Sequence, residues 1–213
     1  VFDAKPVKRR VRVDAIVVAT GFEPFNPEEC PQYGYGVHRN VITGLEFEAM
    51  SRPDGPTGGS IVRVSDGGKP RSVTFILCVG SRDRRHQPYC CRVGCLDALK
   101  HAAVLKDQYG DEVDVYVCYI DVRASCRYCE EFYQSVRERG VVFMHGQPSE
   151  VKPLPDGSLN VEVYDVSTGK LLSIRSDLVV LETGVKPRTD LQPVIGIPLG
   201  SDDFFKEKDP NLN

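Results

Sequence analysis

The middle of the chain alternates between strand and helix patterns of apolar residues. Short apolar runs predict strands at residues 72–79, 113–120 and 141–145. Apolar side chains at helical spacing predict two helices between these strands, at residues 96–106 and 128–139. This order predicts an α/β domain in which helices connect the strands of a parallel sheet.

A different pattern follows this region. Residues 159–166 and 171–174 alternate between apolar and polar side chains, and Thr168 and Gly169 provide a turn between them. These features predict an antiparallel meander after the parallel sheet. Upstream, residues 40–70 are rich in Gly, Pro and Ser, so we expect a long connecting loop there.

A repeated pattern stands near both ends of the chain. Residues 14–24 and 177–187 each begin with Asp, continue through an apolar run to Thr-Gly and reach Pro three residues after the Gly. Continuous apolar runs are typical of buried parallel strands, so both segments are predicted to be such strands. Gly21 and Gly184 allow the backbone to turn, or to approach a ligand closely, where each run ends.

The charge balance and the hydropathy exclude some classes of partner. The chain has 27 Lys and Arg against 30 Asp and Glu, a net charge of −3, which gives no reason to expect nucleic acid as a partner. No apolar run approaches the roughly 20 residues of a membrane-spanning helix. Clustered cysteines without a signal peptide favour a reducing compartment, so we expect a cytoplasmic protein.

Four of the eight cysteines stand close together after the strand predicted at 72–79: Cys78, Cys90, Cys91 and Cys95. A dinucleotide-binding fold would carry a glycine-rich phosphate loop at this point, so thiols in its place favour a metal or redox centre. A [4Fe–4S] cluster needs four converging thiolates, and a zinc site uses similar ligands. Four reduced thiols that pack as small apolar side chains are the third alternative.

The remaining chemistry-bearing residues are less specific. Cys126 and Cys129 form a Cys-x-x-Cys at the start of a predicted helix, which is the spacing of a redox dithiol or of an additional metal site, with incidental thiols as the alternative. We expect Cys30 and Cys118 to be core residues or incidental thiols. His101 is expected to pack or cap, and Glu182 to be solvated unless it lies near a flavin.

The two Thr-Gly strands resemble those of the pyridine nucleotide–disulfide oxidoreductase superfamily. There a strand like Ala19-Thr20-Gly21 lies beside FAD, and a strand like the one ending at Gly184 marks the return from the second domain. The resemblance implies an FAD/NAD(P)-binding-like three-layer domain, with FAD contacts at Thr20, Gly21 and Gly184. No Gly-x-Gly-x-x-Gly follows a strand, so we expect the FAD phosphate loop to lie before Val1, and the isolated residues to bind FAD weakly or not at all.

This resemblance implies a division of the chain into four parts. Residues 1–39 and 184–213 would be truncated FAD-domain segments, 40–70 the connecting loop, and 71–183 an inserted NAD(P)-binding-like domain that carries the cysteine cluster.

A closer resemblance extends over essentially the whole chain. The segments that carry it look like the A subunits of heterodisulfide reductase: Tyr33–Gly36, Asn40–Glu48, Gly55–Gly59, Cys78–Asp83, Tyr119–Arg123, Glu130–Tyr133 and Phe204–Pro210. The resemblance implies a cytoplasmic oxidoreductase of anaerobic metabolism, a flavoprotein with FAD and a [4Fe–4S] cluster that acts on disulfides. Its partners would be B and C-type subunits, with a hydrogenase or ferredoxin as further partners.

The resemblance also bears on the cluster ligands. It implies Cys78, Cys90 and Cys95 as ligands, but Gly94 stands where the family has a further Cys, and Cys91 where the family has Ser. Either Cys91 completes an altered ligand set or the cluster is lost. Because electron transfer needs no catalytic acid, base or nucleophile, none is assigned, and we expect the isolated fragment to be inactive. The alternative function is a cofactor-free scaffold that docks partner redox subunits.

Overall fold

The computed structural model describes residues 7–190 and 192–209, which divide into two compact units. The central unit is Glu23–Lys186, and the terminal unit combines Val1–Phe22 with Pro187–Asn213. The two short strands β1 (Phe22–Pro24) and β10 (Val185–Pro187), which pair with each other, stand where the chain passes from one unit to the other. No helix in the described part of the chain is long and apolar enough to cross a membrane.

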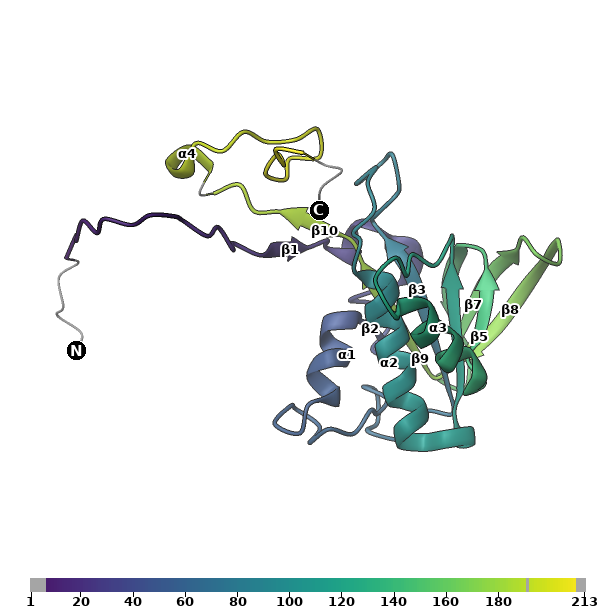
Figure 1. Ribbon diagram of the computed structural model, residues 1–213. Coiled ribbons are helices and arrows are strands. Elements are labelled where there is room, and N and C mark those ends of the chain that lie inside the picture. Colours follow the sequence, from purple (N-terminus) through teal and green to yellow (C-terminus); the bar gives the residue numbers. More distant parts are fainter. Residues whose placement is uncertain (1–6, 191, 210–213) are drawn as a thin grey trace. The chain divides into compact units, whose positions relative to one another are not determined.

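A five-stranded parallel sheet forms the middle of the central unit (Figure 1). Its order is β2-β9-β3-β4-β5. The strands are β2 (Val41–Thr43), β3 (Ser72–Val79), β4 (Asp114–Tyr119), β5 (Val142–His145) and β9 (Leu178–Thr183). Four of the strands predicted from apolar runs are therefore confirmed, and the sheet gains β2, which the sequence patterns did not indicate.

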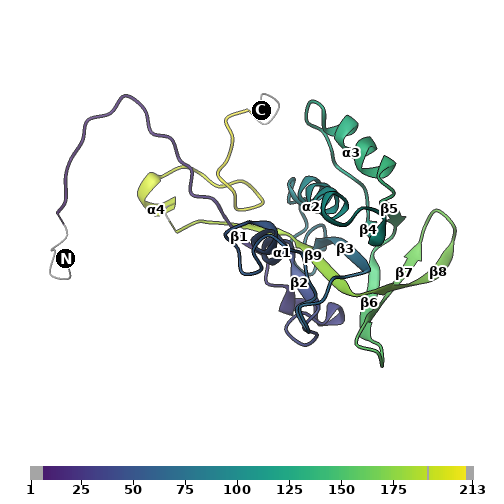
Figure 2. The same ribbon diagram turned by 90° about the horizontal axis from the view of Figure 1, so that it is seen from below.

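Three helices and a second sheet complete the layers. The helices α1 (Gly44–Ser51), α2 (Gly94–Tyr109) and α3 (Cys129–Glu138) lie on one face of the parallel sheet, and the antiparallel sheet β6-β7-β8 lies on the other (Figure 2). This second sheet comprises β6 (Pro148–Pro153), β7 (Leu159–Asp165) and β8 (Lys170–Ser176). The three-layer α/β architecture and the meander are confirmed.

The alternation along β3 explains why both faces are covered. Val73, Phe75 and Leu77 belong to the core shared with the helices, whereas Ile76 belongs to the core shared with the antiparallel sheet. All four side chains are at most 1% exposed, and burying a side chain of this size contributes about 1.5–3 kcal/mol. On the second face Thr74 hydrogen-bonds through its hydroxyl to that of Ser176, 2.5 Å away, which satisfies both buried polar groups.

The prediction of a connecting loop over 40–70 was wrong for its first part. Residues 41–51 form β2 and α1, and Phe47 is fully buried in the core. The physical cause is a capping box at the start of α1: the Thr43 hydroxyl accepts from the backbone N–H of Glu46, and the Glu46 carboxylate accepts from the backbone N–H of Thr43. The remainder, 52–71, contains no helix or strand.

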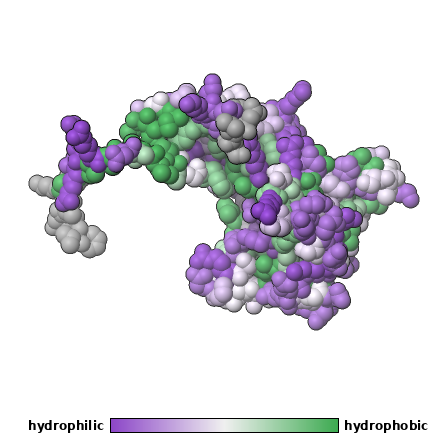
Figure 3. All heavy atoms as spheres, viewed as in Figure 1, coloured by the Kyte–Doolittle hydropathy of each residue, from purple (hydrophilic) through white to green (hydrophobic). Residues whose placement is uncertain are grey.

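The prediction of a buried strand over 14–24 was also wrong. Residues 14–21 have no regular secondary structure, and Ile16 and Val17 are 78% and 90% exposed. A strand needs a neighbour to accept its backbone hydrogen bonds, and within the described residues no strand pairs with residues 14–21; only the end of the predicted segment, β1, has a partner, β10. The terminal unit also contains α4 (Gln192–Ile195), around which apolar residues reach the surface in Figure 3. The side chain of Val194 in this helix is exposed. The surface over α1–α3 is mainly hydrophilic in the same view.

Three short 3₁₀ helices connect these elements: η1 (Pro27–Glu29), η2 (Pro31–Tyr33) and η3 (Gly110–Glu112). Gly140 follows α3 with φ of +82°, the left-handed conformation typical of a glycine after a helix end. The part of the fold that matters most for function is the connection between β3 and α2. It is a 14-residue loop, residues 80–93.

Candidate metal centre in the cysteine loop

The cysteine loop, which we define as residues 78–95, lies at the carboxyl edge of the parallel sheet. Cys78 is the next-to-last residue of β3, and Cys95 is the second residue of α2. The register of β3 against β9 shifts between Ile76 and Val79, so the strand is irregular at Cys78. The carboxyl edge is where open α/β sheets bind their ligands, so the fold puts these thiols at the expected position of a functional site.

All four predicted ligands line one small cavity. Cys78, Cys90, Cys91 and Cys95 share it with backbone and side chains of the loop, and with Asp121 and Arg123, which follow β4. The cavity holds about 10 Å³, which is room for roughly one water molecule. The structure therefore brings together cysteines separated by as many as 17 positions.

Backbone amides point at two of the sulfur atoms. The N–H of Arg92 donates to Cys90 Sγ at 3.3 Å, and the N–H of Gly94 donates to Cys91 Sγ at 3.4 Å. Cys95 Sγ in turn donates to the carbonyl of Asp121 at 3.8 Å. These hydrogen bonds hold the sulfur atoms of Cys90, Cys91 and Cys95 in position at the cavity.

The backbone of the loop is strained at several positions. Cys78, Arg82 and Arg92 have φ values of +59°, +57° and +63°, the left-handed region that residues with a side chain rarely adopt. Each such residue costs on the order of 1–3 kcal/mol, and strain of this kind concentrates at functional sites. The surrounding hydrogen bonds hold the loop in place: the N–H of Arg82 and the hydroxyl of Ser81 both donate to the carbonyl of Tyr89.

Burial and mutual repulsion control the protonation of the thiols. Desolvation, followed by the nearby Cys95 and Cys91, raises the pKa of Cys78 to about 12. Burial likewise raises the pKa of Cys95, with Cys91 and Cys90 adding to the effect. Without a metal these two thiols are therefore protonated at neutral pH, and a metal cation would have to displace their protons.

The chemistry of the donor set fits an iron–sulfur cluster or zinc, since both take thiolate ligands. The side chains do not yet converge: among residues 7–190 and 192–209, no three His, Cys, Asp or Glu side chains are placed to share a metal ion. The four thiols fit a cluster in their chemistry and in their location around one cavity.

The predicted flavin contacts are divided between the two units. Thr20 and Gly21 belong to the terminal unit, and Gly184 belongs to the central unit. Gly21 has φ of +69°, and a Cβ added there would meet nothing within 4 Å. A Cβ added at Gly184 would lie 2.9 Å from Gln87 Oε1 and 3.0 Å from Ser81 Cβ, so this glycine is needed for packing against the cysteine loop. A joint role for the three in FAD binding stays a prediction.

The other cysteines lie apart from this cavity. Cys126 and Cys129 form a disulfide with their Cα atoms 5.2 Å apart, and Cys129 is the first residue of α3, as the sequence indicated. Cys30 and Cys118 are buried, which confirms that they are core residues.

Sequence reasoning missed the residues that complete the cavity wall. Arg82, Arg92 and Arg123 line it, and Arg82 forms an ion pair with Asp121. Arg82 belongs to a stretch with several basic residues, and two of its neighbours make contacts away from the cavity. Arg85 pairs with Asp83 at 2.8 Å, and the His86 ring packs edge-on against Phe25. Asp121 and Arg123 stand directly after β4, and the rule that parallel strands share a carboxyl edge could have found them.

Comparison with known proteins identifies the relatives of this chain. It is 42% identical over 217 residues to the iron-sulfur A subunit of the CoB–CoM heterodisulfide reductase of Methanocaldococcus jannaschii. It is also 42% identical to the A subunit of the H₂/formate:CoB–CoM heterodisulfide,ferredoxin reductase of Methanococcus maripaludis. Each alignment covers 99% of this chain and 33% of the relative. The chain is similar to the heterodisulfide reductase A subunits over this third of their length.

A more distant relative is the A subunit of the ferredoxin:CoB–CoM heterodisulfide reductase of Methanosarcina acetivorans, 36% identical over 242 residues, of which the chain covers 30%. The chain thus spans about a third of the length of the heterodisulfide reductase A subunits that it matches. No known family profile matches it. Among solved structures, thioredoxin reductase from T. acidophilum aligns with 86% of this chain and 48% of its own, at 17% identity and a TM-score of 0.47.

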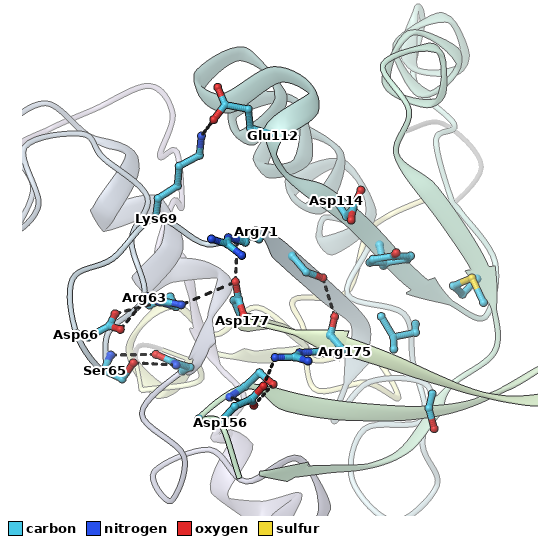
Figure 4. A pocket seen from close by; sticks show the side chains of 18 of the residues that line it. Arg63, Ser65, Asp66, Lys69, Arg71, Glu112, Asp114, Asp156, Arg175 and Asp177 are labelled. Carbon is cyan, nitrogen blue, oxygen red and sulfur yellow. Dashed lines mark hydrogen bonds and ion pairs between the residues drawn. The ribbon is translucent and has the colours of Figure 1, made fainter. Parts of the chain in front are cut away.

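A much wider cavity, of about 1290 Å³, lies at the opposite edge of the sheet, where β3, β4 and β9 begin (Figure 4). Its lining is polar and largely paired: Arg63 with Asp66, Lys69 with Glu112, and Arg175 with Asp156. Because parallel α/β sheets bind ligands at the carboxyl edge instead, we do not assign a cofactor of the heterodisulfide reductase A subunits to this cavity.

Proposed function

We propose that this chain is part of an FAD- and iron–sulfur-containing electron-transfer subunit, and that it binds a [4Fe–4S] cluster through Cys78, Cys90, Cys91 and Cys95. The observation that carries the proposal is the single cavity lined by all four thiols at the carboxyl edge of the sheet. A bound cluster would supply one-electron transfer.

Cys91 takes the role of the missing family cysteine in this proposal. Its sulfur lies in the cavity and accepts a hydrogen bond from Gly94, the residue that replaces the family's Cys. A thiol is thus available close to the position at which the substitution removed one, which supports an altered ligand set over loss of the cluster.

The arginines of the cavity balance the negative charge of the thiolates. Arg123 interacts with the sulfur of Cys90, which raises the pKa of the guanidinium above its ordinary value, with Asp121 as the second cause. Arg82 lowers the pKa of Cys78 against the larger effect of burial. Both cations would stabilise the ligands in the ionised form that a cluster requires.

FAD binding belongs to the proposal for the complete protein. Thr20, Gly21 and Gly184 would contact the flavin, residues 1–39 and 184–213 would be parts of its domain, and 71–183 would be the inserted domain. The open space at Gly21 supports close approach of a ligand to its backbone.

The activity of the complete protein follows from its relatives. We propose an oxidoreductase that transfers electrons within a complex reducing the disulfide of coenzymes B and M, in the cytoplasm. Its partners would be B and C-type subunits, with a hydrogenase or ferredoxin as electron donor. The names of the relatives, which include H₂, formate and ferredoxin, support this assignment.

The alternative function is a cofactor-free scaffold that docks partner subunits. The small cavity and the absence of three converging ligand side chains in the described residues favour it. Zinc is the alternative metal, because a Cys₄ zinc site has the same donors.

Metal and sulfide analysis distinguishes these possibilities. The full chain is prepared without oxygen and reconstituted with iron and sulfide, beside Cys78→Ser and the control Cys118→Ala, whose thiol is buried in β4 away from the cavity. We expect roughly four iron and four sulfide per chain in the native protein and the control, and a loss in Cys78→Ser. If the protein contains zinc and no sulfide, the site is a zinc site and not an iron–sulfur site. Metal-free protein in all three samples would favour the scaffold.

A further inference from the structure

A buried histidine between two carboxylates lies beside the cysteine loop. His101 Nδ1 is 3.0 Å from Glu182 Oε1, and His101 Nε2 is 2.9 Å from Glu48 Oε2. The imidazole therefore bridges β9, which carries Glu182, and α1, which carries Glu48. Both ring nitrogens have a partner, so the ring is held in one orientation.

The exposure of these three residues changes along the chain of hydrogen bonds. The side chain of Glu48 is 39% exposed, whereas those of His101 and Glu182 are 3% and 6% exposed. The ring of His101 is packed against Phe47 and Phe75, with centroid distances of 4.7 and 6.3 Å. One end of the path therefore meets solvent, and the rest is enclosed by apolar side chains.

The inner end of the path reaches the cysteine loop. A Cβ added at Gly94 would lie 3.3 Å from Cys91 Sγ and 3.9 Å from Glu182 Cβ. Gly94 therefore lies between the thiol of Cys91 and the Cβ of Glu182. Glu182 also packs against the start of α1, since a Cβ at Gly44 would lie 2.3 Å from its Oε2.

We propose that Glu48, His101 and Glu182 form a proton relay that carries one proton from solvent to the buried carboxyl beside the cysteine loop. The proton is taken from water by the Glu48 carboxylate and passes to His101 Nε2, while the proton on Nδ1 passes to the Glu182 carboxylate. One proton enters and one reaches Glu182, and the imidazole changes tautomer without a change in charge. Reversal of the same steps returns the proton to solvent.

The charges around the path favour this direction. Burial raises the pKa of Glu182, with Asp97 adding to the effect, while His101 and Lys100 oppose it. The hydrogen bond from Lys100, 2.5 Å away, lowers the pKa of Glu48, and His101 lowers it further. A proton is therefore held more tightly at the inner carboxyl than at the outer one. Protonation of Glu182 would offset negative charge that arrives in the cysteine loop.

A purely structural role would use the same contacts, because the imidazole also ties α2 to α1 and β9. The two roles differ in proton movement, so the test measures exchange. It needs no bound metal and is therefore independent of the proposed cluster.

Infrared spectroscopy of the full chain on transfer to heavy water provides the test. We expect a component of the protonated carboxyl band, followed as the pH is lowered, that is absent in Glu182→Gln and that shifts promptly in the native chain. In Glu48→Gln the shift should slow by roughly tenfold, which corresponds to about 1.4 kcal/mol on the barrier. Glu131→Gln, an exposed glutamate on α3, should behave like the native chain. Equal rates in native chain and Glu48→Gln, or no such band, would overturn the proposal.

A second measurement uses the unaltered chain, so it does not depend on the folding of a variant. The chain has only four histidines, so ¹⁵N-histidine NMR can follow His101 directly. A relay predicts that both ring nitrogens show averaged signals from two interconverting tautomers. A single fixed tautomer at all pH values would contradict it.

Discussion

The backbone N–H of Gly94 donates a hydrogen bond to Cys91 Sγ at 3.4 Å. The resemblance to the heterodisulfide reductase A subunits implies that the chain departs from the family pattern at these two positions, with Cys91 where the family has Ser and Gly94 where it has Cys. The contact places the sulfur of Cys91 next to the backbone of Gly94.

This relationship predicts the behaviour of a compensating pair of substitutions. Cys91→Ser alone should abolish cluster binding, because it removes one of four thiols. Cys91→Ser combined with Gly94→Cys should restore it, since serine at 91 also relieves the 3.3 Å contact that a new Cβ would make with the sulfur. Iron bound per chain is the measurement. Full iron content in Cys91→Ser alone would exclude Cys91 as a ligand.

The stability of the protein should be sensitive to a single methyl group added at Gly184. An added methyl group would lie 2.9 Å from Gln87 Oε1 and 3.0 Å from Ser81 Cβ, both in the cysteine loop. We expect Gly184→Ala to lower the free energy of unfolding by about 1–3 kcal/mol, the usual cost of overpacking. Urea denaturation checks the value. Gly157→Ala, at a turn of β6–β7 where a Cβ meets nothing, is the space control, although its φ of +84° carries a backbone cost of its own.

The metal-free chain should lose stability in alkaline solution. Burial raises the pKa of Cys78 from 9.0 to about 12 in the folded state. The unfolded thiol ionises first as the pH rises, so the unfolded state is favoured progressively between pH 9 and 12, and the contribution is fully present below 9. Thermal unfolding at several pH values measures this effect. Cys78→Ala should flatten the dependence, and an unchanged slope in that variant would count against the raised pKa.

The disulfide between Cys126 and Cys129 predicts a count of reactive thiols. The denatured, unreduced chain should take up alkylating reagent at six cysteines, and at all eight after reduction, as counted by mass spectrometry. Cys126→Ser should leave seven reactive thiols with or without reductant. Eight reactive thiols in the unreduced native chain would show that the pair is a dithiol under these conditions.

The sequence predicted the part of the central unit in which consecutive strands of the chain are also neighbours in the sheet. Strands β3, β4 and β5 and helices α2 and α3 alternate without interruption, so local apolar patterns were sufficient. The helix α1 was hidden because its stabilisation comes from the capping box at Thr43 and Glu46, within a segment whose composition resembles a loop.

The four cysteines of the candidate site could be recognised because they are near in sequence. Its other components could not be recognised in this way. Arg123 reaches the cavity from the loop after β4, and Glu182 lies beside the cysteine loop on β9, 87 residues beyond Cys95 in the sequence. His101 was expected to pack or cap, and it does pack against two aromatic rings, but its pairing with two carboxylates depends on three elements whose proximity only the fold creates.

The visible absorption spectrum of the native chain, prepared and reconstituted without oxygen, tests the central claim most directly. If the four thiols hold an iron–sulfur cluster, the protein will show a broad absorbance that dithionite bleaches and that is absent in Cys78→Ser. A featureless spectrum, in native chain that remains folded by circular dichroism, would contradict the account.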